Sequence, residues 1–210
     1  NPYSIEFDIQ QGSDLLKASL TGKYFLTYKA VNKGLSIRFF GGYFFKAPKN
    51  SPYDARFRFS GIEGQGDYLY EHIFPARNIS DGFWWNHFYE GDGFFKSYST
   101  TFNTWNWLTA VNFSTTIPLP LPIEVYFDIG TSGSEFIQEK DKQFFIYDGG
   151  MKLSLIKEAF EVYFPIVRSP LIRESDDLNN RYSNYFEQIR FVLNLKLFNP
   201  IKLSRQVEFL

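Results

Sequence analysis

The stretch "IRFVLNLKL" at residues 189–197 decides the fold class. Apolar side chains occupy every second position, at Ile189, Phe191, Leu193, Leu195 and Leu197. A period of two predicts a β-strand with one apolar side and one mixed, mostly polar side. The side that meets water then decides the function, because a soluble barrel or sandwich turns its apolar side inward and a membrane barrel turns it outward to lipid.

The same alternation recurs along the chain and predicts about ten strands of roughly 9 to 14 residues, longer than the mean strand of a soluble protein. No segment has a convincing helical period. We therefore expect one all-β, antiparallel domain over residues 1–210. Besides 189–197, the predicted strands cover 3–10, 16–29, 35–47, 53–61, 92–98, 104–115, 123–130, 144–155 and 159–167.

The lengths of the connections favour a transmembrane β-barrel, in which short turns on one side of the membrane alternate with long loops on the other. In the second half of the chain, the connections at 131–142 and 168–184 are long, and those at 116–122 and 156–158 are short. The first half breaks the rule at residues 62–91, which we expect to form a long loop or an insertion into the lumen.

Composition narrows the function classes. The chain has 25 Phe, 14 Tyr and 4 Trp among 210 residues, and its net charge is -1. So many aromatic side chains favour strands and membrane interfaces, whereas the near-zero charge gives no electrostatic support for binding nucleic acid. The chain has no cysteine. Thiolate catalysis and thiolate metal sites are therefore excluded.

The apolar sides of the strands fit lipid better than a protein core. A soluble barrel would have to pack about twenty aromatic side chains into an interior that eight or so strands leave only just filled. With the faces reversed, we expect the last strand to face lipid through its five apolar residues and to guide insertion. The polar sides would then line the lumen, through Lys152, Glu161, Arg190, Asn194 and Lys196.

The sequence contains no recognisable catalytic motif. His72 and His87 lie in "YEHIF" and "WNHFY", without the spacing of two zinc ligands on one helix. No serine lies in a nucleophile motif of the G-x-S-x-G kind. The glycine spacing of "GIEGQG" at 61–66 is more typical of a turn than of a phosphate-binding loop. We therefore expect no catalytic residue, cofactor or metal within this segment.

Two resemblances extend this interpretation. The segments "YDGGMKLSL", "AFEVYFPIV" and "YFEQIRFVLNLKLF" resemble the closing strands of bacterial outer-membrane barrels of the surface-antigen superfamily. Over most of the chain, "SGIEGQGDYLYEHIFPARN", "GDGFFKSYS", "WNWLTAVNFSTTIPLPLPIEVYFDIGT" and "RFVLNLKLFNP" resemble the C-terminal barrel region that follows a gluzincin-type aminopeptidase domain in outer-membrane proteins of Bacteroidetes. This second resemblance implies a larger parent protein with a metallopeptidase domain ahead of residue 1.

We therefore interpret the chain as a bacterial outer-membrane β-barrel, or the C-terminal part of a larger one, that anchors a peptidase-bearing protein. The partners expected are outer-membrane lipid, other subunits of an envelope complex and, during insertion, the barrel assembly machinery. Two alternatives stay open: a surface-antigen-type barrel that inserts or secretes proteins, and a soluble β-barrel or sandwich that binds an apolar ligand.

Overall fold

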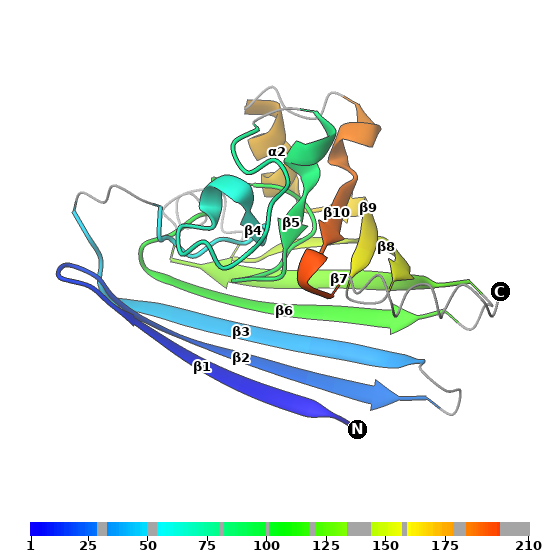
Figure 1. Ribbon diagram of the computed structural model, residues 1–210, viewed down its shortest axis with the longest axis horizontal. Coiled ribbons are helices and arrows are strands. Elements are labelled where there is room, and N and C mark those ends of the chain that lie inside the picture. Colours follow the sequence, from blue (N-terminus) through cyan, green and yellow to red (C-terminus); the bar gives the residue numbers. More distant parts are fainter. Residues whose placement is uncertain are drawn as a thin grey trace.

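The computed structural model describes residues 1–28, 33–49, 54–79, 82–99, 101–117, 121–133, 144–156, 159–178 and 184–197. Eight strands form one antiparallel sheet in which each strand pairs with the next one in the sheet order (Figure 1). They are β1 (Tyr3–Gln11), β2 (Leu16–Thr27), β3 (Gly34–Lys46), β6 (Trp107–Thr116), β7 (Ile123–Ser132), β8 (Ile146–Ile156), β9 (Phe160–Arg168) and β10 (Arg190–Leu193).

The chain between β3 and β6, which we call the inner segment (the described residues of 54–106), lies against one face of this sheet (Figure 1). It contains a two-stranded sheet and two 3-10 helices: β4 (Ile62–Glu63), β5 (Phe88–Tyr89), η1 (Gly64–Gly66) and η2 (Phe83–Asn86). Three further short elements follow β9: α2 (Pro170–Leu178), η3 (Tyr185–Gln188) and η4 (Leu195–Leu197). We call the sheet face that meets the inner segment the inner face, and the opposite one the outer face.

The apolar core lies between the inner face and the inner segment. Phe57, Phe59 and Phe102 of the inner segment are almost completely buried, and they pack against Phe40 and Phe44 of β3 and other buried side chains. Glycines on the inner face make room for these rings. A Cβ added to Gly42 would lie 2.6 Å from the Phe57 ring, and one added to Gly130 would lie 2.7 Å from the Phe59 ring.

The two faces of the sheet have opposite polarity. On the outer face, Tyr3, Ile5 and Phe7 of β1 are 64% to 77% exposed, and Phe127 at the centre of the sheet is 42% exposed. The inner face buries a charged side chain in β2, β3, β7, β8, β9 and β10, and the amide of Asn112 in β6. Alternation along each strand therefore separates apolar from polar side chains, as the sequence predicts.

The all-β, antiparallel class is confirmed, but several predicted elements are wrong in detail. The described part of 53–61 is not a strand, because it crosses the inner face and its one β-bridge is the isolated pair Phe57 and Thr104. Residues 92–98 form turns and bends. The interval 168–184 contains the helix α2, whose Leu171 and Ile172 pack into the core. The sheet is also open, since β1 and β10 do not pair.

Much of the long connection predicted at 131–142 lies outside the described residues, as do 179–183 and the residues after 197. Parts of the two predicted short connections, 118–120 and 157–158, also lie outside the described residues. The segment 62–91, expected as a long loop or an insertion, belongs to the inner segment where it is described.

Candidate functional site

The candidate site is the polar interface between the inner face and the inner segment. Strand register places one row of polar residues side by side across five strands, because each pairs directly with its neighbour. The row consists of Lys23, Arg38, Asn112, Asp128 and Asp148. Buried charges are stable only when they are paired and hydrogen-bonded. The contacts of this row therefore decide how the inner segment is held.

At the most deeply buried part of the row, two carboxylates of the sheet meet one ammonium of the inner segment. Lys96 of the inner segment lies 2.9 Å from Asp128 Oδ1, which also accepts a hydrogen bond from Asn112 Nδ2 at 2.9 Å. Asp148 lies directly opposite Asp128 in the register and accepts a hydrogen bond from the backbone N–H of Ser97. Both carboxylates are fully buried. The ammonium of Lys96 and the backbone of Ser97 thus fix the inner segment to β7 and β8.

The other end of the row joins β2 and β3 to the inner segment. Arg38 Nε lies 2.9 Å from Glu90 Oε1, and Lys23 Nζ lies 2.6 Å from the same oxygen. Arg38 also donates to Asn112 Oδ1 at 3.1 Å. Because Arg38 is buried and Lys23 is about half exposed, the contact with Arg38 is the better protected from solvent screening.

A second cluster lies on β6, β7, β8 and β9. Lys152 Nζ lies 2.9 Å from Glu124 and 3.4 Å from Glu161. Tyr163 donates to Glu161 at 2.6 Å, and Ser114 donates to Glu124. Each carboxylate thus has both a cation and a hydroxyl as partners. Two of the predicted lumen-facing residues, Lys152 and Glu161, meet in this cluster.

Arg190, a third predicted lumen-facing residue, is 1% exposed and connects β10 to the inner segment. Its guanidinium lies 2.8 Å from Glu63, donates to the carbonyl of Ser60 at 2.8 Å, and sits 3.9 Å above the centre of the Phe88 ring. A planar guanidinium suits such a site, because it can donate in several directions while its face stacks on an aromatic ring.

The predicted strand 189–197 is shorter in the structure. Ile189 is the C-cap residue after η3, and only Arg190–Leu193 forms β10. Beyond it, Leu195–Leu197 forms the 3-10 helix η4, since the side chain of Asn194 accepts the backbone N–H of Lys196 and its carbonyl accepts that of Leu197. A polar residue that bonds to its own backbone in this way competes with the sheet ladder.

The register places Phe191 and Leu193 opposite Val162 and Phe160 on β9. The ring of Phe191 is nevertheless covered, because it stacks on Phe83 at 4.5 Å and on His87 at 5.1 Å. Leu195 and Leu197 are exposed, but in η4 rather than on a strand. Lipid contact of these apolar residues stays a prediction.

The last two predicted lumen-facing residues, Asn194 and Lys196, line a cavity of about 1260 Å³ between the inner face and the inner segment. Lys196 Nζ donates to the carbonyl of Glu71 at 2.6 Å. The cavity has acids and bases on its wall, including Glu6, Asp8, Lys23 and Glu71. Its walls therefore suit water and polar ligands of either charge.

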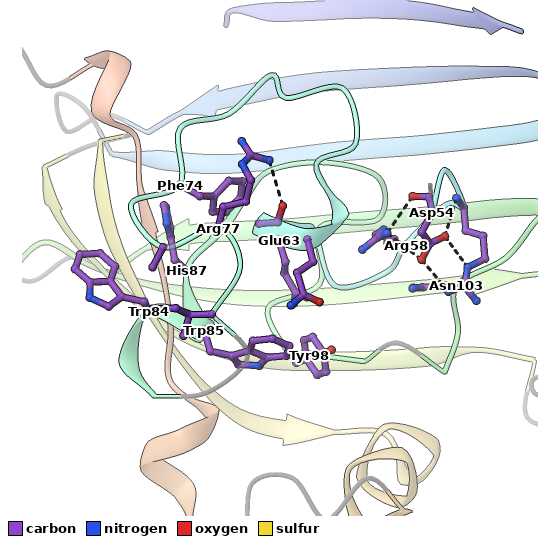
Figure 2. Close-up of a pocket in the computed structure, with 15 residues that line it drawn as sticks. Asp54, Arg58, Glu63, Phe74, Arg77, Trp84, Trp85, His87, Tyr98 and Asn103 are labelled. Carbon is purple, nitrogen blue, oxygen red and sulfur yellow. Dashed lines mark hydrogen bonds and ion pairs between the residues drawn. The ribbon is translucent and has the colours of Figure 1, made fainter. Parts of the chain in front are cut away.

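A smaller cavity of about 210 Å³ lies within the inner segment (Figure 2). At one end Asp54 bonds to Arg56 and Arg58, and at the other Trp84 and Trp85 lie beside His87 (Figure 2). Burial works to raise the pKa of the Asp54 carboxyl, but the two arginines bring it below its usual value. The arginines are thus occupied by a carboxylate of their own segment.

Both histidine rings are stacked on aromatic side chains, His72 on Tyr89 and His87 on Phe191. His87 Nε2 accepts the backbone N–H of Leu193 at 3.2 Å, and burial lowers the pKa of His87 to about 4. The ring of His72 stacks on Tyr89 with a centroid distance of 4.4 Å. Among the described residues, no group of three or more histidine, aspartate or glutamate side chains could hold a metal ion.

Comparison with protein-family models, with curated proteins and with solved structures gave no match for this chain. Within the part of the chain that the structure describes, no helix is both long and apolar enough to span a membrane.

Sequence reasoning missed the partners that the inner segment supplies. Lys96 and Glu63 lie 32 and 127 residues from the charges they pair with, Asp128 and Arg190. The inner segment has no regular period that would place its side chains. One indication of these partners was present in the sequence, namely the charged residues on the polar sides of the strands. If that side is covered, each buried charge requires an opposite charge or a hydrogen-bond partner.

Proposed function

We propose that this chain is the β-barrel portion of a bacterial outer-membrane protein, which it anchors through lipid contacts on the outer face. The observation that carries the proposal is the polarity of the sheet. Large apolar side chains such as Ile5, Phe7 and Phe127 are exposed on the outer face, while Lys96, Asp128 and Arg190 are buried on the other side.

A soluble protein would be more stable with the opposite arrangement, in which the apolar side chains are buried and the charged ones are exposed. Extended apolar patches are rare on soluble monomers, and buried charges cost free energy unless they are paired. In a membrane barrel, the same residues would meet acyl chains on the outside, and paired charges would fill the interior. The inner segment would then act as a plug that closes the lumen.

The activity of the anchored protein is a further part of this proposal. The sequence resemblance implies a metallopeptidase domain in the same parent chain, and it places that chemistry outside these residues. The role of this segment is physical: it would hold the parent protein in the outer membrane, after insertion by the barrel assembly machinery and next to any other subunits of an envelope complex.

The test measures which face of the sheet contacts lipid. The chain has no cysteine, so a single fluorophore can be attached to Phe127→Cys on the outer face or to Thr21→Cys, whose position lines the large cavity. After refolding into phosphatidylcholine vesicles, brominated lipid should quench the label at position 127 strongly and the label at position 21 weakly. Equal quenching, or a protein that stays soluble without vesicles or detergent, would overturn the proposal.

A further inference from the structure

Strand β1 has one edge that pairs with no described strand. Its nine residues pair with β2 on one side only. The backbone N–H of Phe25 donates to the carbonyl of Pro2, and that of Gly12 donates to the carbonyl of Leu15. Because antiparallel strands alternate inward and outward bonding groups, the N–H and C=O groups of Ile5 and Phe7 point away from β2. Such an edge is a template for another strand.

The inner side of this edge carries two acids, Glu6 and Asp8. Glu6 and Asp8 face the large cavity, and neither has an ion pair with a described residue. Asp8 interacts electrostatically with Lys17, but the Lys17 ammonium donates its hydrogen bond to the carbonyl of Ala55. Three acids deeper in the interface differ from these two, since Glu63, Glu124 and Asp128 each have a Lys or Arg partner.

The opposite end of the sheet does not supply the missing neighbour. The free side of β10 is covered by the inner segment, because His87 forms a parallel bridge with Phe191 and accepts the N–H of Leu193. Volume also prevents these eight strands from closing into a barrel by themselves. An eight-stranded barrel has room only for side chains, whereas this inner face carries a folded segment with its own buried aromatic rings.

A second copy of the chain is a poor neighbour for β1. Antiparallel pairing of two β1 strands around Phe7 would place Glu6 of each copy opposite Asp8 of the other. Shifting the register by one pair of residues would instead place Glu6 opposite Glu6, or Asp8 opposite Asp8. Like charges directly opposite one another destabilise a strand pair.

We infer that the open edge of β1 binds a strand from a partner polypeptide in which apolar residues alternate with Lys or Arg. The apolar side chains of that strand would extend the outer face beside Ile5 and Phe7. Its basic side chains would extend the inner face beside Glu6 and Asp8. The inference goes beyond the proposed function and does not require that the outer face contact lipid.

The experiment measures binding of two fluorescent nine-residue peptides to the whole chain by fluorescence anisotropy. One peptide alternates Val with Lys and the other alternates Val with Glu. We expect the lysine peptide to bind at least about fivefold more tightly, because opposite cross-strand charges are favourable and like charges are not. The double variant Glu6→Lys/Asp8→Lys should reverse this preference.

A matched control separates the edge from overall charge. Asp14→Lys/Glu187→Lys changes the net charge by the same amount at exposed positions outside the strand, so it should keep the preference for lysine. Phe7→Pro removes an outward N–H without breaking a bond to β2, and should weaken binding of the lysine peptide by about tenfold. Circular dichroism of each variant checks that the sheet is retained.

Three results would overturn the inference: equal binding of both peptides, a preference that the control variant also reverses, or binding that Phe7→Pro leaves unchanged. Dimerisation through β1 that the lysine peptide fails to displace would show that a second copy occupies the edge. Lipid quenching at position 127 is measured separately, so failure of the proposed anchor and failure of this inference give different results.

Discussion

At the scale of single residues, the interface between the sheet and the inner segment depends on buried side chains that each form a specific hydrogen bond or ion pair. His87 is 2% exposed, and its ring nitrogen Nε2 is the acceptor for the N–H of Leu193 on β10. Lys96 is the cation next to the facing pair Asp128 and Asp148. Replacing either His87 or Lys96 should therefore change the free energy of unfolding more than replacing an exposed residue of the same type.

The folded protein should lose stability as pH falls from about 6.5 to about 4. Burial lowers the pKa of His87 from 6.5 to about 4. Over this range the unfolded chain binds a proton that the folded chain does not, so acid favours unfolding by up to about 3 kcal/mol. Urea unfolding followed by tryptophan fluorescence should show this dependence, and His87→Gln should remove most of it. The same change at the less buried His72 should have a smaller effect.

Lys96→Met should reduce the free energy of unfolding by about 3 to 5 kcal/mol, because it leaves a buried carboxylate without its cation. Adding Asp128→Asn to that variant should recover part of the loss. Lys46→Met is the matched control, since Lys46 is exposed and its ammonium donates to the carbonyl of Ser13, and it should change stability by less than about 0.5 kcal/mol. Equal losses for Lys96→Met and Lys46→Met in urea titrations would contradict this account of the cluster.

At the scale of elements, each strand of the sheet has one face for the inner segment and one that is exposed. The glycines show this difference directly. A Cβ at Gly42 meets the ring of Phe57, whereas a Cβ at Gly22 on the outer face of the neighbouring strand meets nothing within 4 Å. The two positions have the same residue type but opposite requirements for space.

Gly42→Val should therefore destabilise the protein by about 1 to 3 kcal/mol, as expected when extra atoms are forced into a packed core. Gly22→Val should be tolerated, because its side chain would enter open space on a strand that favours β-branched residues. Denaturant titration of the two variants measures the difference. Similar losses at both positions would mean that Phe57 does not pack against β3 in solution.

An arginine substitution on the outer face tests the membrane proposal through folding stability, independently of the quenching experiment. In a bilayer, Phe127→Arg should reduce folding stability by about 2 to 4 kcal/mol if position 127 lies near the midplane. Thr21→Arg should be mild, since that side chain lines the polar cavity. Refolding into vesicles from urea, followed by tryptophan fluorescence, gives both values. A tolerated arginine at position 127 would place this face in water.

At the scale of the whole molecule, an open sheet and a folded inner segment are held together by apolar packing and buried ion pairs. Both side chains of the Lys96–Asp128 pair are almost completely buried, whereas those of the Lys23–Glu90 pair are 48% and 39% exposed. Salt screens exposed charges far more than buried ones. The molecule as a whole should therefore respond weakly to ionic strength.

Raising the NaCl concentration from about 0.1 M to about 1 M should lower the free energy of unfolding by less than about 1 kcal/mol. Urea titrations at the two concentrations measure this difference. Binding of the lysine peptide at β1 should weaken strongly over the same range, because Glu6 is exposed and Asp8 is only half-buried. A large loss of folding stability in salt would mean that the interface depends on its exposed pairs.

The sequence by itself determined the antiparallel all-β class and the opposite polarity of the two strand faces, because alternation is a local property of an extended chain. Lys152 and Glu161 could be assigned to the polar side for the same reason. Only the tertiary structure decided that residues 54–106 cover this side, that Lys96 pairs with Asp128, and that the last strand ends at Leu193. These features depend on contacts between residues far apart in the sequence and on side chains that bond to their own backbone. The alternation of apolar and polar residues predicts neither of them.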